Sequence, residues 1–94
     1  MGNAAKVGDL GLQHDGFHPT KIMTGAATVF VDGLPAARKS DPLFPHAKPD
    51  NPPHPRKIKE GSPLVLFEGK EAAHSTHSID CGGTIVCSST VTIG

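Results

Sequence analysis

The sequence predicts an all-β fold: a small cone-shaped domain of three β-hairpin repeats related by a pseudo-threefold axis, with a structural metal near its apex. Three observations support this prediction. One pattern of residues recurs three times, the recurring segments are short, β-branched and punctuated by glycine, and no segment carries a sustained helical period. The 94 residues suffice for one core only, so we expect residues 1–94 to form a single domain with no extension at either end.

The amino-acid composition predicts a core with few large apolar side chains. Hydrophobic residues make up 36% of the chain, with four Phe and neither Trp nor Tyr, whereas 11 Gly and 9 Pro indicate many turns. Nine basic residues balance nine acidic ones, which argues against a nucleic-acid partner. No apolar run is long enough to span a bilayer and the N-terminus lacks a signal peptide, so we expect synthesis in the cytoplasm.

Three elements recur in the same order along the chain. The first contains two alanines followed by a basic residue or histidine, in segments 3–9, 35–41 and 71–77. The second places a metal-capable side chain four residues before an isoleucine, in segments 18–25, 54–61 and 81–88. The third is a short β-branched run, in segments 28–33, 64–69 and 90–94. Each copy therefore predicts one hairpin unit, with loops of unequal length between the first two elements.

Turns and loops follow from glycine and proline. Asp32-Gly33 and Glu68-Gly69 fit tight turns, because glycine adopts the positive φ that such turns need. Residues 42–55 contain six prolines, so we expect a stiff loop there rather than a helix or a central strand. A linker between two domains is the alternative, but neither flank is long enough to fold alone.

The repeats bring four metal ligands into consideration. His18, His54 and Cys81 hold equivalent positions and are expected to converge on the threefold axis. His77 is the fourth candidate, because it replaces the aspartate of the other two copies and stands four residues before Cys81. Three imidazoles and one thiolate suit tetrahedral Zn²⁺, and four protein ligands leave no open position, which is typical of a structural site. We therefore expect one structural Zn²⁺ per chain.

The remaining histidines and the second cysteine are not in the predicted ligand set. His14 and His46 each follow an aspartate by five residues, so either remains an alternative to His18 or His54. His74 aligns with Lys6 and Arg38 and is expected at the surface, and Cys87 is expected to be a small, partly buried thiol. In so small a domain, the free energy gained by burying apolar surface barely exceeds the cost in conformational entropy. Loss of one zinc ligand should therefore threaten the fold.

The chain resembles the PAAR-repeat proteins. Residues 29–38 read Val-Phe-Val-Asp-Gly-Leu-Pro-Ala-Ala-Arg and contain the Pro-Ala-Ala-Arg signature of that family. Residues 77–83 resemble the His-x3-Cys-Gly segment of the family's last repeat, and residues 91–94 resemble its closing strand. The third copy departs from the motif as Glu-Ala-Ala-His, and its last strand is one residue short.

This resemblance implies a non-enzymatic, zinc-sharpened tip that caps the trimeric VgrG-type spike of a bacterial type VI secretion system. One copy per homotrimer is expected, because three quasi-equivalent repeats in one chain satisfy three equal sites. The resemblance also implies non-covalent effectors as further partners, transient contact with a target membrane, and ejection from the bacterial cytoplasm. The strand ends expected to continue the spike's sheets are Val29, Val31, Val65, Phe67, Val91 and Ile93.

Two other functions remain as alternatives. A zinc-dependent hydrolase needs an open coordination position and a base such as Asp15 or Asp80, and the sequence has no His-Glu-x-x-His helix or nucleophile elbow. A free-standing structural zinc-binding β-protein needs no partner at all. Zinc content and capture by a spike trimer distinguish these alternatives.

Overall fold

A computed structural model describes residues 2–12, 19–48, 51–80 and 82–93. The strands in these segments are β1 (Gly2–Asn3), β2 (Leu10–Gly11), β3 (Thr20–Lys21), β4 (Phe30–Val31), β5 (Leu34–Pro35), β6 (Pro42–Lys48), β7 (Asn51–Lys57), β8 (Ser62–Phe67), β9 (Lys70–Ala72), β10 (Ile85–Val86) and β11 (Thr92–Ile93). None of the described residues forms a helix, so this part of the chain offers no helix that could cross a membrane. The predicted all-β class is confirmed.

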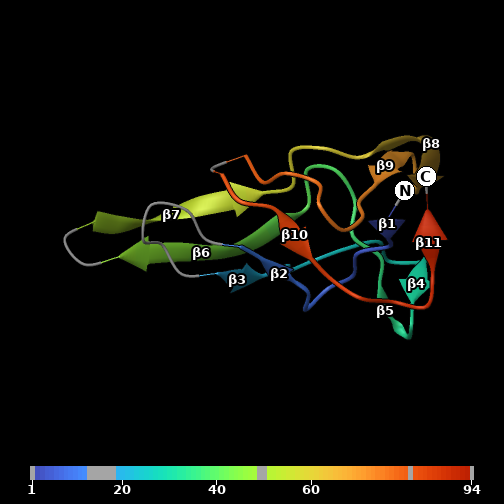
Figure 1. The fold of residues 1–94 in the computed structure, drawn as a ribbon, viewed down its shortest axis with the longest axis horizontal. Coiled ribbons are helices and arrows are strands. Elements are labelled where there is room, and N and C mark those ends of the chain that lie inside the picture. Colours follow the sequence, from blue (N-terminus) through green and yellow to red (C-terminus); the bar gives the residue numbers. More distant parts are fainter. Residues whose placement is uncertain (1, 13–18, 49–50, 81, 94) are drawn as a thin grey trace.

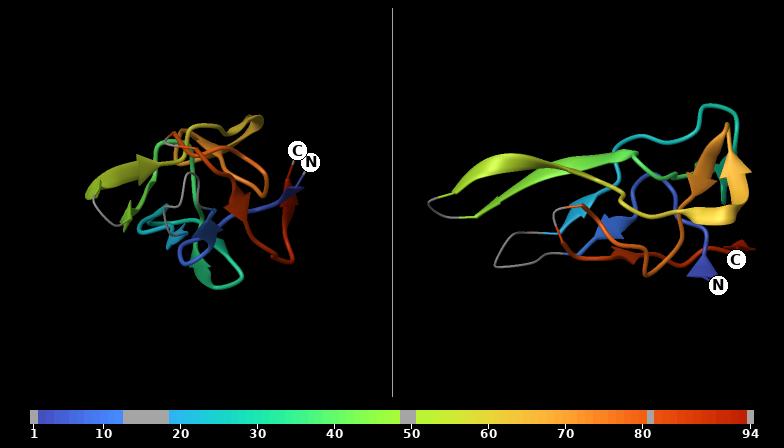
Figure 2. Two further views of the ribbon diagram at one scale, coloured as in Figure 1. Left: turned by 60° about the vertical axis from the view of Figure 1, so that its left-hand side comes forward. Right: turned by 90° about the horizontal axis from the view of Figure 1, so that it is seen from above.

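The strands form five small antiparallel sheets. Four sheets pair two strands each, β1–β11, β4–β5, β6–β7 and β8–β9, and the fifth has the order β10–β2–β3. In Figure 1 the β6–β7 hairpin projects at one end of the molecule, whereas β1, β4, β5, β8, β9 and β11 gather at the other. Both termini lie at this second end, which we call the base (Figure 2).

Two hairpins of the base close through the predicted turns. Asp32 and Gly33 have φ values of 50° and 84°, and Glu68 and Gly69 have 55° and 82°. Positive φ at both central residues is the geometry of a type I′ turn, whose twist matches that of the strands it joins. The third pair of base strands is made by the two ends of the chain, with Gly2 opposite Ile93.

A ring of backbone hydrogen bonds ties distant parts of the chain together. The Ala5 amide donates to the Ala73 carbonyl (2.9 Å), Ala73 donates to Ala37 (3.0 Å), and Ala37 donates to Ala5 (2.9 Å). All three alanines are completely buried. Side chains larger than a methyl group find little room where three backbones approach this closely, which explains the alanine pairs of the repeated motif.

Isoleucines from the second repeated element form the core beside this ring. Ile22, Ile58 and Ile85 are each 1% exposed and pack in one cluster with the three ring alanines. Leu43 and Ile79 complete that cluster. A second cluster lies toward the base and contains Ala4, Ala26, Val31, Ala36, Ala72 and Ile93.

The prediction of a proline-rich loop over residues 42–55 is wrong. Strands β6 and β7 pair antiparallel across it, with Leu43 opposite Arg56 and register shifts farther along the hairpin. In a two-stranded sheet both strands are edges, so a proline on the outward side of its strand removes no ladder hydrogen bond. The register shifts provide the irregular positions that prolines also tolerate.

Candidate metal centre and base

The four predicted zinc ligands are only partly within the described structure. His18 and Cys81 lie outside the described residues, and for His54 the backbone alone is described, in β7. The segments that follow His18 and Cys81 share one sheet, since β3 and β10 both pair with β2. Among residues 2–12, 19–48, 51–80 and 82–93, no group of three or more metal-capable side chains is found. The predicted zinc site therefore stays a prediction.

His46 occupies a place that the sequence pattern did not reveal. Its backbone lies directly opposite that of His54 in the β6–β7 pair. Cα atoms of directly opposed residues in antiparallel strands are about 4.5–5.5 Å apart. The alternative in which His46 contributes a ligand therefore has a physical basis in the strand register. His14, the other alternative, lies outside the described residues.

His77 closes a turn with one of its ring nitrogens. Nδ1 accepts a hydrogen bond from the His74 amide (3.1 Å), and the two imidazole rings stack with centroids 3.6 Å apart. Burial, followed by the proximity of His74, lowers the pKa of His77 from its usual value, which favours the neutral ring. With Nδ1 as acceptor, the proton of the neutral ring is on Nε2. A metal bond at Nε2 therefore requires this proton to be lost or to move to Nδ1, which ends the hydrogen bond from the His74 amide.

His74 is buried rather than exposed, contrary to the expectation from its alignment with Lys6 and Arg38. It is 8% exposed, and its Nδ1 lies 2.7 Å from the Ser75 carbonyl. Stacking against His77 and packing beside β1 through the Ala4–His74 bridge account for this burial.

The same turn occurs twice more with a carboxylate in place of the His77 ring. Asp9 accepts from the Lys6 amide (2.9 Å), and Asp41 accepts from the Arg38 amide (2.8 Å). Each carboxylate also pairs with the basic side chain three residues earlier, at 2.9 Å in both cases. The aspartate-to-histidine replacement noted in the sequence thus preserves the acceptor of the turn.

Arg56 is a buried cation that no sequence pattern singled out. It is 2% exposed and lies in β7, two residues after His54. Its guanidinium donates to the carbonyls of Gly11 (3.0 Å) and Leu12 (2.6 Å) and to the Thr20 hydroxyl (2.9 Å). An arginine between a proline and a lysine is typical of a surface segment, and only the fold reveals its burial.

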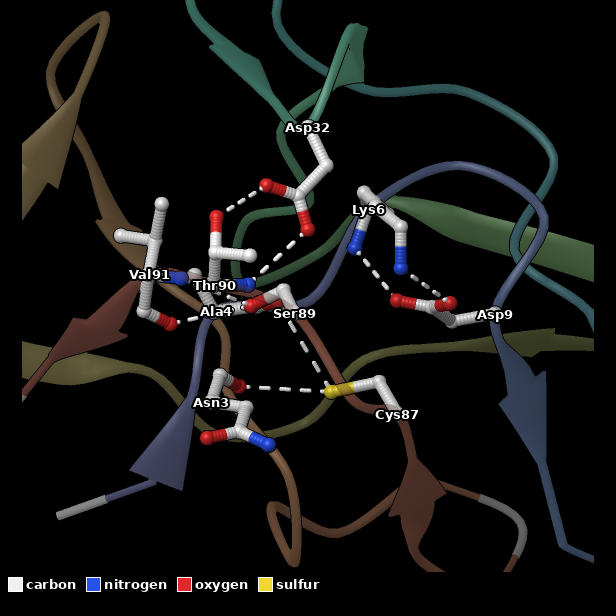
Figure 3. Close-up of polar contacts among 9 residues, drawn as sticks. All are labelled: Asn3, Ala4, Lys6, Asp9, Asp32, Cys87, Ser89, Thr90 and Val91. Carbon is white, nitrogen blue, oxygen red and sulfur yellow. Dashed lines mark hydrogen bonds and ion pairs between the residues drawn. The ribbon is translucent and has the colours of Figure 1, made fainter.

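Carboxylates lock the outer turns of the base to neighbouring segments. Asp32 accepts hydrogen bonds from the Thr90 amide (2.9 Å) and hydroxyl, as Figure 3 shows. Glu68 accepts from the Thr28 amide (2.7 Å) and hydroxyl (2.5 Å), and also pairs with Arg38 at 2.8 Å. Hydrogen bonds from these threonines lower the pKa of Asp32 and of Glu68.

The predicted partner-binding side chains are less exposed than expected. Val31 and Ile93 are 2% and 8% exposed and belong to the core, so their expected exposure is wrong. Val29, Val65 and Phe67 are partly buried against the same cluster, and only Val91 is exposed. Successive strand residues alternate faces, and the sequence did not fix which face points inward. The large apolar side chains exposed at the base are Phe30, Leu34, Leu64, Leu66 and Val91.

The fold and these sites define a small, all-β protein in which three copies of one sequence motif contribute to a shared core. The PAAR-motif family model matches residues 13–87, so the chain belongs to the PAAR-motif family. A comparison with curated proteins gives no match. Membership of this family indicates a structural protein associated with the spike of a type VI secretion system, and secretion through that system.

Proposed function

We propose that this protein is the tip that caps one trimeric VgrG-type spike, one copy per trimer. The alanine ring carries the proposal, because it joins three copies of one motif within a single chain. A partner with exact threefold symmetry offers three equal sites, and a pseudo-threefold monomer can occupy all of them together. In this role the protein is non-enzymatic: it sharpens the spike, helps it pierce a target membrane and accompanies effectors out of the cell.

The base is the surface that we assign to the spike. Its three two-stranded sheets are β1–β11, β4–β5 and β8–β9. Strands β1, β5 and β9 also hydrogen-bond to neighbouring segments on their second side, so β4, β8 and β11 are the outer strands and the ones suited to strand addition. Phe30, Leu64 and Leu66 are 59%, 84% and 58% exposed and supply apolar contact area beside those edges. These side chains replace Val31 and Ile93 as the proposed contacts.

Co-purification with a labelled spike trimer tests this proposal. We expect one chain per trimer, measured by native mass spectrometry. Leu64→Glu and Phe30→Glu should weaken binding while leaving the melting temperature nearly unchanged, because both side chains are already exposed. Leu10→Glu on β2, also exposed but away from the base, is the matched control and should bind normally. Three chains per trimer, or equal binding by all variants, contradicts the proposal.

We also propose that one zinc ion cross-links the repeats near the apex, held by His18, His54 and Cys81 with His77 as the fourth ligand. The donor set fits zinc, since imidazole and thiolate are its preferred ligands. The bound ion supplies a cross-link and no chemistry. The hydrogen bond at Nδ1 of His77 makes this ligand the most demanding of the four. His46, the alternative to His18 or His54, lies opposite His54 in the strand register and is a further candidate ligand.

Two variants separate these ligand sets without destroying the turn. His77→Asp keeps the acceptor that Asp9 and Asp41 provide in the other copies, and His46→Ala removes an imidazole from a projecting hairpin. If His77 is a ligand, His77→Asp lowers zinc affinity and His46→Ala does not. The reverse pattern assigns the position to His46. A wild-type protein that contains no zinc contradicts the metal proposal altogether.

A further inference from the structure

Arg56 gathers carbonyl groups from parts of the chain that are far apart in sequence. Besides Gly11, Leu12 and Thr20, its guanidinium approaches the Gly82 carbonyl at 3.5 Å, the limit of a hydrogen bond. A buried cation is costly unless its donors are satisfied, and a guanidinium with five donors in one plane suits several acceptors around it. Segments from all three copies of the motif thus meet at one side chain.

The positions that meet here are equivalent in the three repeats. Arg56 follows His54 by two residues, Thr20 follows His18 by two, and Gly83 follows Cys81 by two. The Thr20 hydroxyl accepts from Arg56 at 2.9 Å. A Cβ atom added to Gly83 would lie 3.5 Å from Arg56 Nη2 and only 2.3 Å from the Leu12 carbonyl oxygen. The three equivalent positions therefore border one shared space, which the long side chain of Arg56 fills, Thr20 lines with a short side chain and Gly83 leaves open.

This placement connects Arg56 to the proposed zinc site. Two of its partners lie close to proposed ligands along the chain: Thr20 is two positions from His18, and Gly82 is one position from Cys81. Arg56 itself lies two positions from His54. Side chains on an already ordered backbone lose less conformational freedom when they bind a metal. Mutation of groups that hydrogen-bond around metal ligands and orient them commonly lowers metal affinity about 10–100-fold.

We propose that Arg56 is a positioning residue for the metal, because its guanidinium ties the Thr20 hydroxyl and the Gly82 carbonyl, near two of the ligand positions, to the strand that carries the third. This inference rests on the proposed zinc site and names the residue that prepares it. Lysine is a poor replacement, since an ammonium group lacks the planar fork that reaches carbonyls on several sides.

Zinc affinity, measured by competition with a chelator, tests the proposal on the full chain. We expect Arg56→Met and Arg56→Lys to weaken zinc binding about tenfold or more. Co²⁺-substituted protein should show an altered visible spectrum in both variants, because that spectrum reports the ligand arrangement. A lower melting temperature with unchanged zinc affinity and an unchanged Co²⁺ spectrum overturns the inference, since a purely structural arginine gives that result.

A swapped variant makes the test specific to the shared space. Thr20→Arg combined with Arg56→Thr moves the guanidinium from one repeat to another. We expect the double variant to recover at least half of the loss of zinc affinity, measured on a logarithmic scale, that Arg56→Met causes. Swapped protein that binds zinc as weakly as Arg56→Met overturns the proposed equivalence.

A milder pair of variants applies if the arginine variants fail to fold. Thr20→Val removes one acceptor of Arg56 and should weaken zinc several-fold, whereas Thr28→Val removes a hydroxyl at the base and should leave zinc affinity unchanged. Equal affinity in these two variants overturns the inference while the zinc site stands. Absence of zinc from the wild-type chain overturns the zinc site and the inference together.

Discussion

The turns at residues 6–9, 38–41 and 74–77 share one backbone but differ in their side chains. In each, the amide of the first residue donates to a side chain three residues later. The third residue has positive φ in all three, at 95° for Gly8, 77° for Ser40 and 74° for Thr76. The first two turns are closed by ion pairs and the third by stacked imidazoles. The fold therefore requires a hydrogen-bond acceptor at the fourth position of the turn, but this acceptor can be a carboxylate or an imidazole.

Removal of Asp41 should give the largest loss of stability among the three turns. Asp41 is 2% exposed and accepts three hydrogen bonds from Arg38. Asp41→Ala leaves the guanidinium and an amide without these acceptors, so we expect the free energy of unfolding to fall by about 3 kcal/mol. Urea unfolding of the zinc-loaded chain measures this change. A loss below about 1 kcal/mol contradicts the importance assigned to burial of the pair.

Asp9→Ala is the matched change in the first turn and should cost less. The side chains of Lys6 and Asp9 are each 13% exposed, so water compensates for part of the lost pairing. We expect a loss of about 1 kcal/mol in the same urea experiment. Equal losses at Asp9 and Asp41 contradict the distinction between the two turns.

Thr76→Gly should stabilise the third turn. A β-branched residue in the left-handed region is strained, and the equivalent residue of the first turn is Gly8. Part of the gain is offset by the greater freedom of glycine in the unfolded chain, so we expect a net gain of about 0.5–1 kcal/mol. Thermal unfolding measures it, and Gly8→Thr is the reverse control, which should destabilise. Destabilisation by Thr76→Gly contradicts the assigned strain.

Acid should weaken the base through Asp32 and Glu68. Because hydrogen bonds from Thr90 and Thr28 lower the folded pKa values of these groups, their stabilisation is present above the unfolded pKa, near 4, and is lost as the pH falls through the lowered values. The slope of unfolding free energy against pH below about 4 should be shallower in Asp32→Asn/Glu68→Gln protein. Zinc release is common to both proteins, so the difference between their slopes reports the two carboxylates. Equal slopes contradict the prediction.

Cys87 should react slowly with alkylating reagents. Burial, followed by the charge of nearby Asp9, raises the pKa of this thiol to about 11, and its Sγ donates to the Asn3 carbonyl at 3.3 Å (Figure 3). Since the thiolate is the nucleophile, we expect iodoacetamide at about pH 8 to modify Cys87 in the folded protein about a hundredfold more slowly than in the same protein unfolded in urea, with the modified peptide identified by mass spectrometry. Similar rates contradict the assigned burial. Folding stability that involves this thiol is present below its unfolded pKa and lost as the pH rises toward 11.

Local sequence patterns predicted the parts of the fold that depend on short-range chemistry. The Asp32-Gly33 and Glu68-Gly69 turns occur where the sequence predicted them, because the positive φ of such turns restricts the residue type. The proline-rich hairpin was missed because proline content excludes central strands but not a two-stranded sheet.

Long-range contacts account for the rest of what the sequence did not predict. Val31 and Ile93 point into the core and Phe30 points out, a choice that a short β-branched run does not reveal. Burial of Arg56 depends on carbonyls more than 25 residues away in sequence, and burial of His74 depends on β1 at the other end of the chain. The opposition of His46 and His54 follows from a strand register that only pairing defines.

The alanine ring has a mechanical consequence. A closed cycle of amides has no terminal member from which unzipping can begin, and each of Ala5, Ala37 and Ala73 is both donor and acceptor. A one-residue slip of any one segment therefore breaks two of the three bonds at once, so the three segments hold one another in register.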